Sequence, residues 1–306
     1  VAVGLVGFSL FMVLTYVISR SVEGRRKATD RMVTGWVTAA FSLAVIPLVS
    51  LTWTVVEKGL NRLDVDFFTQ SMRNVVGPGG GALHAIVGTL ELTGIATLIS
   101  VPLGIMTAIY LVEYGRGRLA KAVTFFVDVM TGIPSIVAGL FAFSLFLIIL
   151  GPASAINGFA GAVSLAVLMT PVVVRATEEM LKIVPNELRE ASYALGVPKW
   201  LTIVKVVIPT ALAGIATGVI IAIARIIGET APLLLAAGFT TSMNYNPFEE
   251  KMMTLPVFVY TSYAIQGTDV QSYVDRAWAG ALTLMLIVMI LNLVARIISK
   301  LFSPKG

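Results

Sequence analysis

Residues 210–238 have the sequence TALAGIATGVIIAIARIIGETAPLLLAAG, and this stretch decides the class of fold. It is longer than the ~20 apolar residues that a helix needs to cross the hydrocarbon core of a membrane. Only Arg225 and Glu229 carry charge within it, and an arginine at the bilayer centre costs at least about 2.5–3.5 kcal/mol. Because such residues usually face a bundle interior or a water-filled path, we expect a protein that moves a polar solute, an anion, across a membrane.

The composition of the whole chain agrees with a polytopic, all-α membrane protein. The chain is 57% hydrophobic and 13% charged, with a mean hydropathy of +0.90, whereas soluble domains carry about 25% charged residues. The chain has no cysteine, which excludes disulfides and thiol chemistry. Its one histidine, His84, leaves no histidine-based metal site, and a net charge of +5 does not suggest nucleic acid.

Seven apolar stretches are long enough to span a membrane. We place them at about 1–19, 33–56, 82–111, 122–150, 158–175, 208–238 and 278–298. The fifth stretch is short, but apolar residues continue through Val184, so a tilted helix could extend that far. The connecting segment 239–277 is long and rich in apolar residues. It either dips into and caps the bundle or forms an ordinary structured loop.

The distribution of lysine and arginine predicts the orientation of the spans. One set of connecting segments holds most of these residues, including those at 20–31, 116–121, 175–205 and 300–305. The other set holds only Lys58, Arg62, Arg73, Lys251 and Arg276. The basic set is therefore expected on the cytoplasmic side, with the C-terminus inside and, for seven spans, the N-terminus outside.

The longest cytoplasmic segment, 184–200, has the sequence VPNELREASYALGVPKW and predicts a helix, a bend and a second short helix that runs toward Pro209. Pro185 and Asn186 are helix-start residues, and Gly196 suits the left-handed position after a helix. One face carries an apolar stripe of Leu188, Ala191 and Leu195. Such a stripe suits docking in a groove of a partner protein or contact with lipid headgroups, and these residues alone leave both open.

This segment resembles the "EAA" loop of ABC importer permeases. That pattern has Glu-Ala-Ala, three residues, Gly, nine residues, Ile, one residue and Leu-Pro, and the matching positions here are Glu190, Ala191, Ser192, Gly196, Val206, Ile208 and Pro209. Ser192, Val206 and Ile208 depart from it conservatively. The resemblance implies a coupling helix at about 185–200 that docks on an ATP-binding subunit. The residues expected to couple are Glu190, Ala191, Ser192, Leu195 and Gly196.

Three further stretches resemble the phosphate permeases within that family: TGIPSIVAG at 131–139, TPVVVRATE at 170–178 and ARIIGETAPLL at 224–234. The last is similar to the A-type rather than the C-type subunit. The resemblance implies a type I ABC importer-like transmembrane domain of about six core helices. We assign this domain to 32–306 and an extra N-terminal transmembrane helix with a basic cytoplasmic loop to 1–31.

The resemblance also carries the family's transport-critical arginine and acid onto Arg225 and Glu229. Four residues apart on one helix, they could form an ion pair. Pro232 removes a hydrogen bond to the carbonyl of Gly228 and is expected to kink the helix. Broken helices near the membrane midplane often form transport sites, and the planar guanidinium suits phosphate oxygens.

Arg175 and Thr230 complete the predicted substrate pathway. Glu91 and Asp128 also lie within spans, and either could pair with an arginine. For both, a structural partner is expected rather than a contact with substrate, because a carboxylate repels phosphate. His84, near the outer end of its span, is expected at the membrane interface. No catalytic or metal-binding residue is expected.

No Gly-rich loop ending in Gly-Lys-Ser or Gly-Lys-Thr is present, so this chain cannot hydrolyse ATP by itself. The resemblance implies a bacterial plasma-membrane heterodimer with a C-type permease, two ATP-binding subunits that hold ATP and Mg, and an external phosphate-binding protein. No cofactor is expected on this chain. Three alternatives stay open: a permease for sulfate or another oxyanion, an intramembrane lipid-phosphate enzyme, which would need a histidine near the arginines, and a receptor subunit, which should show a soluble signalling domain.

Overall fold

The computed structural model describes residues 2–302, and every regular element among them is helical, so the predicted all-α class is confirmed. Among these residues, six helical segments are long and apolar enough to cross a membrane, and a bent pair of helices would make a seventh span if the pair crosses as one. The chain divides into two compact units, Val1–Glu57 and Lys58–Gly306. The main helices are α1 (Ala2–Glu23), α2 (Arg25–Gly59), α4 (Leu83–Ile109), α5 (Arg118–Thr131), α6 (Ser135–Leu150), α7 (Gly158–Ile183), α8 (Asn186–Ala194), α9 (Lys199–Thr202), α10 (Ile208–Ile227), α11 (Ala231–Ala236), α12 (Leu255–Ala264) and α13 (Val270–Phe302).

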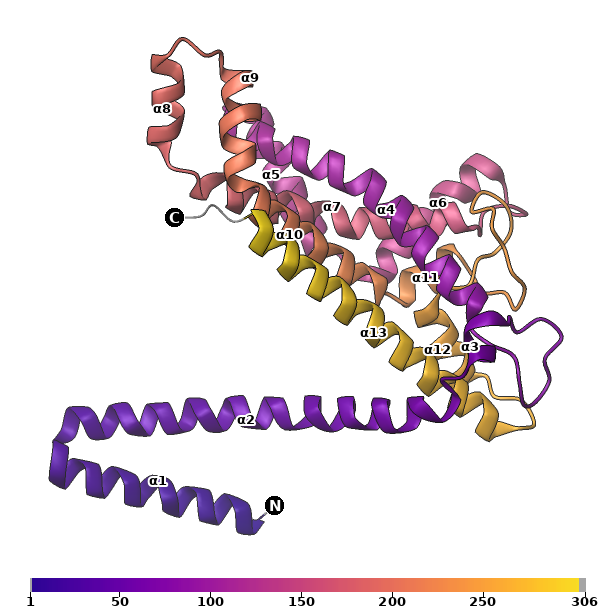
Figure 1. The fold of residues 1–306 in the computed structure, drawn as a ribbon, viewed down its shortest axis with the longest axis horizontal. Coiled ribbons are helices and arrows are strands. Elements are labelled where there is room, and N and C mark those ends of the chain that lie inside the picture. The colour runs from indigo at the N-terminus through magenta and orange to yellow at the C-terminus, as the bar shows by residue number, and fades with distance from the viewer. Residues whose placement is uncertain (1, 303–306) are drawn as a thin grey trace. The chain divides into compact units, whose positions relative to one another are not determined.

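The first unit is a helical hairpin of α1 and the larger part of α2 (Figure 1). Its turn is at Gly24, whose φ of +88° favours glycine. An ion pair of 2.7 Å between Arg31 and Glu23 closes the turn. Phe8 and Trp36 pack edge to face, with ring centroids 5.2 Å apart. Both helices meet the length and composition of a membrane span.

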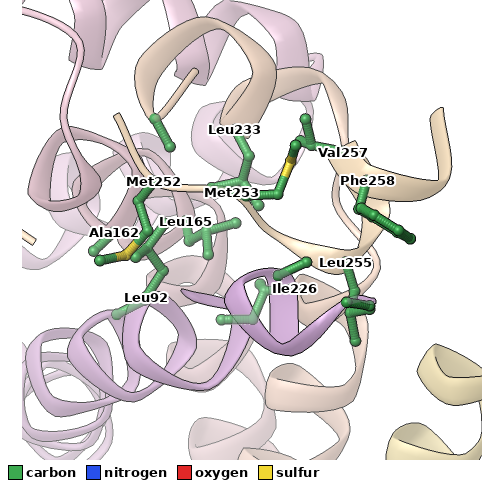
Figure 2. Packing of buried hydrophobic residues seen from close by; sticks show 14 of the residues in the cluster. Leu92, Ala162, Leu165, Ile226, Leu233, Met252, Met253, Leu255, Val257 and Phe258 are labelled. Atoms are coloured by element: carbon green, nitrogen blue, oxygen red, sulfur yellow. The ribbon is translucent and has the colours of Figure 1, made fainter. Parts of the chain in front are cut away.

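The second unit is a helical bundle in which α4 and α7 pack along most of their length (Figure 1). Gly104 of α4 allows this approach, because a Cβ there would lie 2.7 Å from Val173 of α7. Figure 2 shows the core that gathers around this pair, with side chains from α4, α7, α10, α11 and the segment at the start of α12. Helix α7 ends at Ile183, so the fifth predicted span extends beyond residue 175 as the apolar pattern allowed.

The span predicted at 122–150 is not one helix. Two helices, α5 and α6, cover this stretch and meet at an angle of 109°. The break lies at Gly132–Pro134, where Pro134 has extended backbone angles of φ −58° and ψ 138°. Proline has no N–H to continue the helical ladder and disfavours a helical conformation at the residue before it. The apolar run is therefore a broken pair and not one straight helix.

The span predicted at 208–238 with a kink near Gly228 is interrupted there. Helix α10 ends at Ile227, Gly228 to Thr230 leave the helix, and α11 starts at Ala231. Pro232, predicted to kink the helix, lies in the first turn of α11, where a missing N–H is tolerated. The chain therefore breaks instead of bending.

The segment 239–277 caps the bundle, which resolves the alternative left open by its composition. Its helix α12 buries Leu255, Val257 and Phe258, and the residues before it bury Met252 and Met253 in the core (Figure 2). The backbone N–H of Leu255 donates a 2.7 Å hydrogen bond to Oγ1 of Thr89 on α4. The cap is thus fixed to the bundle by both apolar and polar contacts.

The loop between the short helix α3 (Val65–Thr69) and α4 is held by two arginines. Arg276 of α13, 1% exposed, donates from Nη1 to the carbonyls of Gly77 and Gly79 at 2.7 and 3.0 Å. Arg62 donates from Nη2 to the carbonyl of Gly80 at 2.7 Å. All three glycines have positive φ, so this glycine loop adopts a backbone that other residues would resist.

Candidate transport site and coupling surface

Arg225 lies in the last turn of α10, and its side chain is exposed. Glu229 follows the end of that helix and is half-buried; its backbone N–H donates to the carbonyl of Ile226 at 3.1 Å. Because Glu229 is outside the helix, the two residues do not stand one helical turn apart. The ion pair that their spacing allowed is not formed among the described residues.

The break beside Arg225 is supported from α6. Thr230 is the residue before α11 and is half-buried, and Pro232 is buried. Gly139 of α6 lies against Pro232, since a Cβ at Gly139 would be 2.6 Å from the Cα of Pro232. This backbone-to-backbone contact fixes the start of α11. The site therefore combines an exposed guanidinium with a supported helix break.

Arg175 lies on α7 and is held by two carboxylates. Its Nη1 is 2.5 Å from Oε2 of Glu178, and its Nη2 pairs with Asp128 of α5. Glu178 also pairs with Lys182 at 2.7 Å. The expectation that Asp128 has a structural partner is confirmed. Glu178 was not singled out from the sequence, although its spacing from Arg175 and Lys182 on one helix could have indicated it.

Glu91 and His84 lie in surroundings that differ from those expected from the sequence. Glu91 is half-buried and makes no ion pair with any described residue, and its Oε2 has no hydrogen-bond partner there. The pairing with an arginine that the sequence allowed is not formed. His84 is 2% exposed and packs edge to face on Phe258, with ring centroids 5.7 Å apart. It is buried and not interfacial, because α12 covers it.

The coupling segment forms α8, which starts after Pro185 as predicted. Gly196 has a φ of +74°, so the predicted left-handed residue is confirmed. Its N–H donates to the carbonyl of Tyr193 at 2.9 Å, and the N–H of Val197 donates to that of Ser192 at 3.2 Å. These bonds satisfy carbonyls at the end of α8.

The predicted second short helix does not stand alone. Helix α9 continues through a π-helical segment, Ile203–Val207, directly into α10. Pro209 lies in the first turn of α10, just after this segment. Proline cannot donate to the ladder, and π-helical turns accommodate such local changes in the hydrogen-bond pattern. The coupling segment is thereby continuous with the span that carries Arg225.

The predicted coupling residues divide into exposed and buried ones. Glu190, Ala191 and Gly196 are exposed, and Leu195 is 83% exposed. Ser192 is buried, and its Oγ lies 2.8 Å from Oγ1 of Thr202 on α9. The exposed apolar surface also includes Leu188, Tyr193 and Trp200. Ser192 thus holds α8 against α9, while the others face outward.

A residue that the sequence did not single out, Arg189, anchors α8. Its guanidinium donates to Oε1 of Glu113 at 2.8 Å and to the carbonyls of Val184 and Leu181 at 2.7 and 3.0 Å. The two paired side chains are only 12% and 5% exposed. Lys199 of α9 donates to the carbonyl of Glu113. Both arms of the coupling segment therefore meet the π-helical continuation of α4, Tyr110–Tyr114.

Comparison with known proteins agrees with this architecture. Residues 100–305 match the family model "Binding-protein-dependent transport system inner membrane component". The chain is 46% identical over 285 residues to "Phosphate transport system permease protein PstA 1" of Mycobacterium tuberculosis (strain CDC 1551 / Oshkosh), which covers 92% of each chain. It is 39% identical over 276 residues to the PstA permease of Haemophilus influenzae, covering 89% of this chain and 94% of that one.

Two solved structures show the same fold at low sequence identity. A bacterial alginate ABC transporter in complex with an alginate-bound periplasmic protein gives a TM-score of 0.62 at 17% identity, covering 90% of this chain and 98% of that chain. The MetNI methionine ABC transporter gives 0.59 at 19% identity, covering 72% and 96%. The expected ABC importer transmembrane fold is confirmed. By the family match and the identity to its relatives, the chain belongs to the PstA family of phosphate transport system permeases.

Proposed function

We propose that this chain forms, with a second permease subunit, the membrane path along which an ATP-driven importer moves phosphate. The observation that carries the proposal is the exposed guanidinium of Arg225, which has no ion-pair partner among residues 2–302 and lies beside a helix break. A charge in a membrane span must face water or protein and not lipid. The surface around Arg225 is therefore expected to line the path or to meet the second subunit.

The chemistry of this surface suits a phosphate ion in transit. A guanidinium offers parallel N–H donors to two oxygens of one phosphate and stays charged. The hydroxyl of Thr230 adds a donor nearby in sequence. The half-buried carboxylate of Glu229 repels the anion, and transport requires that each contact be weak enough to release its ion.

Arg175 remains a predicted pathway residue, but unlike Arg225 it is already paired with carboxylates. Its guanidinium is neutralised by Glu178 and Asp128, so an anion can reach it only by replacing a carboxylate. Asp128 is the partner that can leave, because its side chain is 61% exposed whereas that of Glu178 is 11% exposed. We propose that Arg175 meets phosphate only in a conformation in which α5 has moved away from α7.

We further propose that α8 docks on an ATP-binding subunit, which holds ATP and Mg, and that movement of α8 reopens the path. The full assembly would contain a C-type permease, two ATP-binding subunits and an external phosphate-binding protein. The excess of lysine and arginine supports an orientation with α8 and the C-terminus in the cytoplasm. Residues 1–31 are proposed as an extra membrane helix with a basic loop, ahead of a permease domain at 32–306.

The experiment is uptake of labelled phosphate into vesicles that contain the assembled importer. Arg225→Gln should reduce uptake at least tenfold while the complex still assembles, and Arg225→Lys should do nearly as badly because lysine lacks the planar fork. Arg116→Gln, which removes an exposed charge outside the site, is the control. Excess sulfate should not compete; competition by sulfate would favour the broader oxyanion permease. Uptake of Arg225→Gln at the level of the control would refute the proposal.

A further inference from the structure

A polar groove of about 500 Å³ lies between α10 and α13, which pack side by side (Figure 1). Its lining includes Thr217 and Ile221 of α10 and Asn292, Arg296, Ser299 and Lys300 of α13. None of the residues that line it is acidic. A groove that is both basic and polar is unexpected on the side of two membrane spans, because lipid-facing positions are normally apolar.

The polar residues follow the helical repeat on both walls. Asn292, Arg296 and Lys300 are spaced by four residues, so they lie above one another on one face of α13. On α10, Thr217 and Ile221 have the same spacing, and Arg225 continues their row. At ~1.5 Å per residue, Arg225 lies about 12 Å along α10 from Thr217. The groove is therefore in line with the site proposed for the anion.

The charges in the groove are not neutralised by the protein. Arg296 and Lys300 are exposed, and neither pairs with a carboxylate of the residues that the structure describes. Asn292 uses one N–H on the carbonyl of Val288 at 2.9 Å, which leaves its second N–H for a ligand. Two cations with neighbouring amide and hydroxyl donors are the groups that bind phosphate oxygens.

Membrane anchoring alone does not account for this arrangement. Lysine and arginine at a helix end reach the interface with their long side chains, which would explain Lys300. Asn292 lies two turns deeper, and Thr217 faces the same groove from α10. Neither side chain is long enough to reach the interface in that way. Basic pockets between membrane helices on the cytoplasmic side are known to bind anionic headgroups.

We propose that the α10–α13 groove binds a phosphate group, supplied either by an anionic phospholipid or by inorganic phosphate that has passed Arg225. Only the second source rests on the proposed function. The positive charge of Arg296 and Lys300 attracts the group, and the amide of Asn292 orients it. On the orientation given by the basic residues, the groove opens toward the cytoplasm.

The test compares the double variant Arg296→Gln with Lys300→Gln in the assembled importer with a control of equal charge loss, Arg116→Gln with Arg118→Gln. Both control residues are exposed and lie outside the groove. Native mass spectrometry counts phosphatidylglycerol retained after detergent washing. Labelled phosphate uptake is measured in vesicles of phosphatidylcholine alone and in vesicles with added phosphatidylglycerol. Arg296→Lys, which keeps the charge, should stay within twofold of the wild type in both assays.

Loss of one retained phosphatidylglycerol in the double variant, with the control unchanged, supports the lipid source. An at least tenfold loss of uptake in pure phosphatidylcholine, with lipid retention unchanged, supports the inorganic source. Equal behaviour of the double variant and the control in both assays overturns the inference. A wild-type importer that does not take up phosphate would instead refute the proposed function, and lipid retention would still decide whether the groove binds a phosphate group.

Discussion

The ion pair between Arg189 and Glu113 should control how firmly α8 is held. Breaking a buried pair by removing one partner costs about 3–5 kcal/mol, because a charge is left without its partner. Glu113→Gln keeps an oxygen acceptor, so we expect the lower value, about 3 kcal/mol. Arg189→Gln also removes donors from the carbonyls of Val184 and Leu181, which adds about 1 kcal/mol each. We therefore expect about 5 kcal/mol for that variant.

Hydrogen exchange of the α8 amides in the purified complex measures the free energy with which α8 is held in place. A loss of about 3 kcal/mol corresponds to an increase in the opening equilibrium of about 100-fold. Glu187→Gln is the matched control, since Glu187 is on the same helix, exposed and without an ion-pair partner in the described part of the chain. The double variant Glu113→Gln with Arg189→Gln leaves neither charge unpaired. Its loss of α8 stability should therefore be smaller than the sum of the losses in the two single variants.

The reasoning fails if Glu113→Gln exchanges no faster than Glu187→Gln, or if the double variant costs the full sum of the single ones. Either result would mean that the pair does not hold α8. Binding of the ATP-binding subunit, measured by co-purification, should fall with the loss of α8 protection and not with the loss of charge alone. The control variant separates these two effects because it removes a carboxylate from the first turn of α8, which should cost at most about 1 kcal/mol of helix stability.

Three further predictions follow from local geometry. Gly196→Val puts a β-branched residue at a φ of +74°, which should cost about 1–2 kcal/mol in backbone strain. Both the co-purification of the ATPase and the uptake of phosphate should fall, and normal values of both would contradict the coupling role. Introduced cysteines at Val76 and Arg116, both exposed, should react with an impermeant thiol reagent in intact cells at Val76 only, and the reverse pattern would overturn the orientation. Because Arg225 and Glu229 form no ion pair, Arg225→Gln combined with Glu229→Gln should not restore uptake, and restored uptake would show that the two residues only neutralise each other.

Local backbone chemistry could be predicted from the sequence. The left-handed Gly196 and the start of α8 after Pro185 were both predicted correctly, because glycine and proline restrict or permit backbone angles wherever they occur. The helix break at Gly132–Pro134 was not predicted, and the interruption at Gly228–Thr230 was predicted as a kink and not as a complete break. An apolar run with a proline fits both a kinked helix and two separate ones. Contacts such as that of Gly139 with Pro232 decide between them, and they join distant parts of the chain.

For the charged groups too, the sequence predicts what depends on neighbouring residues and not which distant residues meet. A structural partner was expected for Asp128 because a carboxylate repels phosphate, and the structure pairs it with Arg175. The pairing of Arg189 with Glu113 joins residues 76 positions apart and has no signature in spacing. Arg225 and Glu229 do not form the ion pair that a spacing of four residues allows on a helix, because α10 ends at Ile227, before Glu229.

The hydrogen bonds from Arg276 to Gly77 and Gly79 determine when, during synthesis of the chain, this loop can take its final shape. The acceptor carbonyl of Gly77 precedes its donor by 199 residues. At a synthesis rate of about 5–20 residues per second, the ribosome makes the loop about 10–40 s before the arginine exists. During this interval those carbonyls lack that donor, so the loop cannot yet be held in its final shape. Protection of the Gly77–Gly80 region from an external protease should therefore appear only after α13 has been inserted, and would report the insertion of that helix.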